Sequence, residues 1–115
     1  MRLRATRRRT ARFFGAYDAV LTPTVGDETP RIGYLDPTAD SQQIIDRGFS
    51  WNAFAPLQNI TGEPAISLPL AESASGLPVG MMLSADVGRE ARLLELAFEL
   101  EEARPWARIG ALPSG

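Results

Sequence analysis

The chain has 115 residues, of which 44% are hydrophobic, and its formal net charge is -2. This length suffices for one domain with a modest core, and no apolar stretch approaches the ~20 residues that cross a bilayer. We therefore expect a soluble, cytoplasmic protein with no nucleic-acid or membrane partner. Because cysteine and histidine are both absent, we expect no disulfide, no metal and no cofactor.

All twelve basic residues are arginine, and none is lysine. Arginine stays protonated at neutral pH and does not serve as a general base. Without lysine, histidine or cysteine, the serines lack every ordinary partner that activates a nucleophile. Fourteen carboxylates leave open an enzyme that uses Asp and Glu alone, but no pattern pairs them into an acid and a base. The composition therefore predicts no complete catalytic site.

The first segment is basic and amphipathic. Residues 2–14 carry six arginines, with apolar residues at helical spacing, and Gly15 follows as a terminator. Three interpretations are open: the solvated face of a helix, an organellar transit peptide, or a phosphate-binding arm. We favour the solvated face, because residues 90–102 hold five glutamates that offer partners.

A buried strand of the parallel type is predicted at residues 17–22 (YDAVLT), closed by Pro23. Residues 23–50 then form a long irregular connection in which Ile44 and Ile45 are the one apolar pair. Loops longer than about 15 residues are uncommon in compact domains. We expect this connection to be functional, partly helical near residues 42–47, or packed on something outside the chain.

The most aromatic stretch is WNAFAPLQNI at residues 51–60, where Phe54, Leu57 and Ile60 are spaced as on one face of a helix. Pro56 is expected to lie in the first turns of this helix or to kink it. Residues 65–70 and 78–85 are two short strand-like runs with a small polar connector, which predicts a hairpin or a nearby strand pair.

A final helix is predicted at residues 87–103, capped by Ser84 or Asp86 and stopped by Pro105. Its expected apolar stripe consists of Leu93, Leu94, Ala97 and Phe98. Within the preceding strand, Gly80 leaves room for a close approach of neighbouring atoms.

Four short sequence segments carry a resemblance to a known family. They are DAVLTP at 18–23, NITGEPAISL at 59–68, GLPVG at 76–80 and EARLLELA at 90–97. In this order and spacing they closely resemble the C-terminal end of the amidase-signature family, over about residues 10–106. The resemblance implies an α/β fold: the C-terminal portion of a mixed sheet, with few strands flanked by helices, in a single fragment domain over residues 1–115.

The resemblance also implies what the chain lacks. Members of the family hydrolyse amide bonds with a Ser nucleophile, a second Ser in a cis peptide bond and a Lys base, in a Gly- and Ser-rich segment upstream of the matched region. This chain has no lysine and no such run. No catalytic residue can be carried over, and we expect no hydrolysis by the chain alone.

In the family, the helix before the Asn-x-x-Gly turn helps to wall the substrate tunnel, and here it corresponds to residues 51–59. The resemblance therefore makes Trp51, Phe54 and Leu57 candidates for an apolar substrate pocket. Thr24 and Asn59 are candidate ligand contacts at a strand end and at the turn. The structural alternatives are core packing for the first three, strand-end solvation for Thr24 and backbone bracing for Asn59.

Two hypotheses of different class follow. In the first, the chain is the structural and substrate-pocket portion of an amidase. Its partner is then the missing N-terminal portion, or a second copy bound through exposed apolar edges, and a small amide substrate binds only in the complete enzyme. In the second, it is an independent non-catalytic binding or assembly module derived from an amidase.

Overall fold

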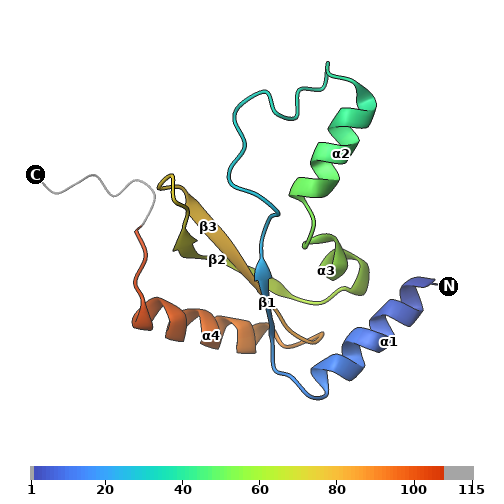
Figure 1. Ribbon diagram of the computed structural model, residues 1–115. Coiled ribbons are helices and arrows are strands. Elements are labelled where there is room, and N and C mark those ends of the chain that lie inside the picture. Colours follow the sequence, from blue (N-terminus) through green and yellow to red (C-terminus); the bar gives the residue numbers. More distant parts are fainter. Residues whose placement is uncertain (1, 108–115) are drawn as a thin grey trace, which may run out of the picture.

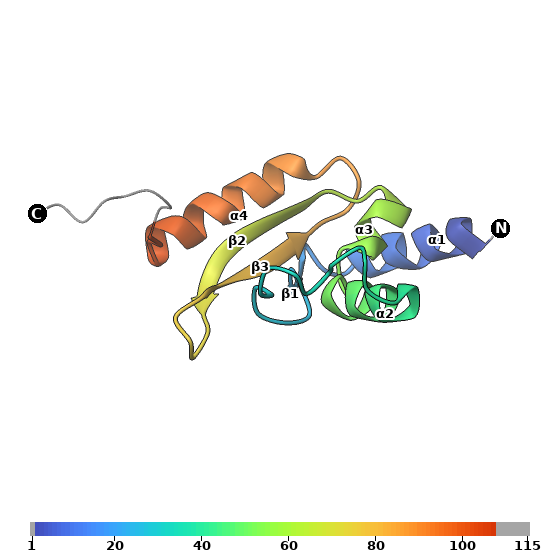
Figure 2. The ribbon, with the colours of Figure 1, turned by 90° about the horizontal axis from the view of Figure 1, so that it is seen from above.

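The computed structural model describes residues 2–107, and for residues 2–4 their backbone alone. The elements in chain order are α1 (Arg2–Phe14), β1 (Val20–Pro23), α2 (Ser41–Trp51), α3 (Pro56–Thr61), β2 (Ala65–Glu72), β3 (Pro78–Ser84) and α4 (Glu90–Ala103). One sheet of order β1-β3-β2 holds the strands. α4 lies at one side of the sheet, and the other three helices gather at the opposite side (Figures 1 and 2). The α/β prediction is confirmed.

The predicted hairpin is confirmed, because β2 and β3 pair antiparallel with Ile66 opposite Leu83. A register shift between Leu68 and Ala71 spans Pro69, which has no N–H to donate to a ladder. The parallel-type strand was a wrong prediction. β1 pairs antiparallel with β3, which inserts between β1 and β2. β1 also begins later than predicted and includes Pro23, and it is half-buried rather than buried.

The core lies between α4 and the sheet, where Leu68 and Leu83 meet Leu93 and Ala97. Two of the four residues predicted for the apolar stripe of this helix were wrong, since Leu94 and Phe98 are 52% and 69% exposed. Leu96 and Leu100 pack on the core in their place. Positions 93, 96, 97 and 100 share one helical face, from which 94 and 98 are rotated by about 100°.

The start of α4 also differs from the prediction. The helix begins at Glu90, and its N-cap, Arg89, makes no side-chain capping bond. Asp86 forms a turn instead: its Oδ1 accepts from Val87 N at 2.9 Å, and its carbonyl accepts from Arg89 N at 3.0 Å. Gly88 has a φ of +82°, which continues this turn and delays the helix.

α1 agrees with its prediction at both ends, and Gly15 N donates to Ala11 O and Arg12 O at 3.2 Å. Its side chains at positions 7–9 and 12 are exposed, as expected for a solvated face. The helix packs against α3. No helix within residues 2–107 is long and apolar enough to cross a bilayer.

The long connection is partly helical. α2 begins where Asp40 Oδ1 accepts from Gln42 N and Gln43 N at 3.0 and 3.3 Å. The helix predicted over residues 51–60 covers only α3, since Trp51 ends α2 and residues 52–55 separate the two helices. Pro56 explains the break, because its ring excludes a helix through the preceding turn but suits the first position of a new one.

Candidate functional site

Apolar side chains from three elements surround a hollow of about 480 Å³. Phe13 and Phe14 come from the end of α1, Val20 from β1, and Phe54 and Leu57 from the start of α3 and the residues before it. We call this space the α1–α3 hollow. Its size and mostly apolar lining are typical of small-molecule sites.

Buried polar groups form part of the wall. Gln58, 9% exposed, donates from Nε2 to Ser84 Oγ at 3.2 Å. Gln58 Oε1 and Thr22 Oγ1 are buried without a partner. Each unpaired atom costs about 1–3 kcal/mol. This part of the wall therefore holds unsatisfied polar atoms in an apolar setting.

Glu63 brings a carboxylate to the same hollow. The residue is 7% exposed, and it follows Gly62, whose φ of +76° turns the chain from α3 toward β2. Among the described residues, no hydrogen bond or ion pair engages this carboxylate. Arg9, an exposed residue of α1, also lines the hollow. The sequence prediction missed Glu63, Gln58 and Thr22 as site residues.

The structure brings together two of the five predicted site residues. Phe54 and Leu57 line the α1–α3 hollow, and Trp51, Thr24 and Asn59 do not. Trp51 borders a smaller space of about 200 Å³, where its carbonyl accepts from Gly26 N at 2.8 Å. The Trp51 indole Nε1 is buried without a partner.

The remaining two predicted residues, Thr24 and Asn59, line neither of these two spaces. Thr24 Oγ1 lies 2.6 Å from Ser67 Oγ, in a hydrogen bond over the surface of the sheet. Asn59 is exposed on α3 and lines none of the spaces described above.

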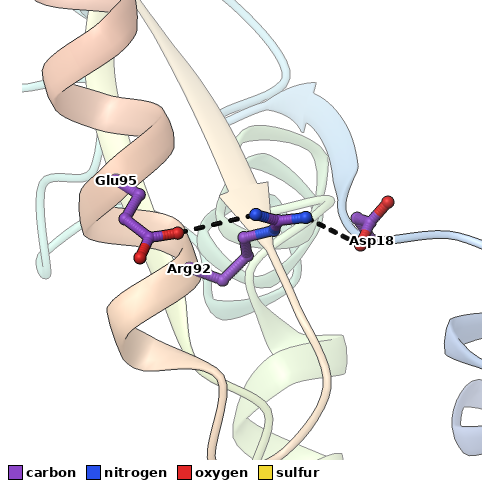
Figure 3. Close-up of polar contacts among 3 residues, drawn as sticks. All are labelled: Asp18, Arg92 and Glu95. Carbon is purple, nitrogen blue, oxygen red and sulfur yellow. Dashed lines mark hydrogen bonds and ion pairs between the residues drawn. The ribbon is translucent and has the colours of Figure 1, made fainter.

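Three charged residues that do not line the hollow form a surface cluster, shown in Figure 3. Arg92 of α4 contacts Asp18 Oδ1 at 3.2 Å and Glu95 Oε2 at 3.5 Å. The hydrogen bond that Arg92 donates to Asp18 is the main cause that raises the pKa of Arg92. The side chains of Arg92 and Asp18 are 50% and 79% exposed, so this cluster links α4 to the segment before β1 without forming a site.

Several serines of the described region are hydrogen-bonded to other polar side chains. Ser84 pairs with Gln58, and Ser67 pairs with Thr24. Ser75 Oγ donates to the Glu28 carboxylate, with distances of 3.0 and 2.9 Å to its two oxygens. This exposed contact ties the hairpin connector to the loop after β1. Within residues 2–107, no group of three acidic residues is arranged to hold a metal ion.

Comparison with known proteins identifies close relatives. The Amidase family model matches residues 1–94. AmiC of Mycobacterium leprae is 75% identical over 109 residues, which cover 95% of this chain and 23% of that protein. The 6-aminohexanoate-cyclic-dimer hydrolase of Paenarthrobacter ureafaciens is 38% identical over 96 residues, covering 78% of this chain and 20% of that protein.

Solved structures show the same arrangement. A structure of 6-aminohexanoate cyclic dimer hydrolase superposes with a TM-score of 0.78 at 37% identity, covering 90% of this chain and 23% of that one. The crystal structure of a glutamyl-tRNA(Gln) amidotransferase component from Thermotoga maritima gives a TM-score of 0.75 at 25% identity, covering 92% and 22%. The chain thus spans about a quarter of the length of these relatives.

Proposed function

This chain belongs to the amidase family, and on that premise we propose that it is the C-terminal structural and substrate-pocket portion of an enzyme that hydrolyses carboxylic amides. The observation that carries the proposal is its match to 23% of the length of a relative with which it shares 75% identity. The sequence has no lysine or histidine, so the groups that activate a nucleophile would come from the remaining portion.

A small core supports a role as part of a larger assembly. Within the described residues, six hydrophobic side chains are buried, and large ones such as Phe49 (74% exposed) and Phe98 (69%) are left uncovered. The accessible surface is 9081 Å², whereas a compact protein of this mass exposes about 6,200 Å². β1 and β2 are both edge strands here. Apolar surface and free strand edges of this kind favour association with another polypeptide.

The pocket role rests on the α1–α3 hollow. We assign Phe54 and Leu57 to an apolar wall that excludes water and selects the non-reacting part of an amide substrate. Trp51, Thr24 and Asn59 lie outside this hollow, so a substrate role for them requires the geometry of the complete enzyme. We further propose a cytoplasmic location, which imaging of a fluorescently tagged chain would test.

Activity of the purified chain tests the proposal. The chain is offered a panel of aliphatic and aromatic amides, and light scattering gives its mass in the same sample. We expect no hydrolysis, together with self-association through the uncovered apolar surface. Hydrolysis at an enzymatic rate would overturn the proposal. A stable, inert monomer that binds a small ligand would instead favour an independent binding module.

A further inference from the structure

Glu63 is the one acidic residue among the described residues that line the α1–α3 hollow. The residue is 7% exposed. Its carboxylate oxygens are not among the fully buried, unpaired side-chain atoms of the described residues, so they remain open to the hollow and can meet a ligand there. No group within the described part of the chain engages the Glu63 side chain. The position therefore has room for a donor that the described residues do not supply.

The surroundings define the chemistry of that donor. Phe54 and Leu57 offer an apolar wall, and the hollow of about 480 Å³ is large enough for a small organic molecule. A cationic nitrogen would gain both a charge-assisted hydrogen bond and an ion pair with Glu63. A ligand carboxylate would be repelled by Glu63, whereas Arg9, an exposed residue that lines the same hollow, would attract one.

We propose that the α1–α3 hollow binds small molecules with an apolar body and a terminal ammonium group, with the ammonium paired to Glu63. The apolar body packs against Phe54 and Leu57. In the complete enzyme this site selects amides that carry a protonated amine, a step that rests on the proposed function. Binding of the amine itself requires only the residues of this chain.

A titration with hexylamine, and with 1-hexanol as the uncharged control, tests the proposal on the 115-residue chain. Nuclear magnetic resonance gives both the dissociation constants and the amides whose resonances shift. We expect hexylamine to bind about tenfold more tightly than 1-hexanol, as a charged hydrogen bond implies. The shifts are expected to gather at residues 54, 57 and 63. Hexanoate, whose charge is opposite, should bind more weakly than 1-hexanol.

Matched variants test whether the Glu63 carboxylate is the charge that pairs with the ammonium group. Glu63→Gln keeps the shape of the side chain, and we expect it to remove the preference for hexylamine while leaving 1-hexanol binding unchanged. Glu72→Gln is the control, because Glu72 is exposed at the end of β2 and does not line the hollow. Equal affinity of the wild-type chain for hexylamine and 1-hexanol would overturn the proposal, even if Glu63→Gln did not fold. Shifts confined to residues outside the hollow would also overturn it.

A second experiment tests whether the hollow binds a small molecule or is filled by a protein segment in the complete enzyme. The hexylamine titration is repeated after adding the part of Mycobacterium leprae AmiC that lies outside the matched 23%. Retained binding supports the proposal, whereas loss of binding on complex formation shows that a protein segment fills the hollow, and overturns it. Neither result depends on catalysis. A complex that binds hexylamine but hydrolyses nothing would contradict the proposed function and leave the amine site standing.

Discussion

The hydroxyl oxygens of Thr24 and Ser67 lie 2.6 Å apart above Gly80, on the face of the sheet that α4 does not cover. A Cβ at Gly80 would lie 2.9 Å from Thr24 Oγ1 and 3.0 Å from Ser67 Oγ. Thr24 N also donates to Gly80 O at 2.9 Å. A glycine in the central strand thus makes space for a cross-sheet hydrogen bond that joins β2 to the end of β1.

Gly80→Ala tests this relationship. We expect it to lower the free energy of unfolding by about 1–3 kcal/mol, because the new methyl group displaces both hydroxyls. Gly48→Ala is the matched control, since nothing lies within 4 Å of its Cβ position inside α2. That change should stabilise the chain by up to about 1 kcal/mol. Urea unfolding measures both, and equal tolerance of the two changes would show that Gly80 is not constrained.

Thr22→Val addresses the polar wall of the hollow. Thr22 Oγ1 is buried without a partner, so replacing the hydroxyl by a methyl group of similar shape should raise the free energy of unfolding by about 1 kcal/mol. Thr38→Val is a suitable comparison, because Thr38 Oγ1 donates to Asp36 Oδ1 at 2.7 Å and would lose that bond. A destabilised Thr22→Val protein would mean that the hydroxyl has a partner in solution.

The surface cluster around Arg92 predicts a salt-dependent effect. Because Arg92 and its partner Asp18 are half or more exposed, Arg92→Ala should lower the melting temperature only slightly. That difference should vanish at about 1 M salt, where the Debye length is near 3 Å. Thermal unfolding at low and high salt measures it. A large effect that persists in salt would require a structural role for Arg92 beyond the ion pair.

The stability of the fold is expected to depend on pH through Asp36, whose carboxylate accepts a hydrogen bond from Thr38. The backbone N–H of Thr38, followed by its hydroxyl, lowers the pKa of Asp36 below its ordinary value of 3.8. A lowered folded-state pKa stabilises the fold fully above 3.8, and this contribution is lost as pH falls through the folded-state pKa. Asp36→Ala should therefore differ most from wild type at neutral pH and least in acid. Melting temperatures between pH 2 and 7 check this, and a difference that grows in acid would contradict it.

Local signals in the sequence were sufficient for part of the fold. The ends of α1 follow from its periodicity and from Gly15, and Gly62 takes the left-handed conformation expected at a helix end. The kink expected at Pro56 is a full break, and the residues of the predicted helix belong to two helices. The exposure of Phe98 could not be foreseen, because an apolar side chain at helical spacing does not reveal which face meets the sheet.

Two of the candidate site residues named from the sequence, Phe54 and Leu57, line the hollow. They do not share one helix, because Phe54 precedes α3. Their role in a substrate pocket stays a prediction. Glu63 was missed, although a charged residue between a glycine turn and an apolar strand is unusual enough to serve as a signal. Trp51 could not be excluded from the hollow by sequence, since its direction depends on the break at Pro56. The family resemblance is confirmed by the match over residues 1–94.

The most direct test of the central claim is reconstitution. The chain is mixed with the portion of Mycobacterium leprae AmiC outside the matched 23%, and complex formation and amide hydrolysis are followed with intact AmiC as the reference. We predict a one-to-one complex that hydrolyses the amides accepted by intact AmiC, while each part alone is inert. A chain that hydrolyses amides by itself, or that remains a well-folded monomer and forms no complex, would contradict the account.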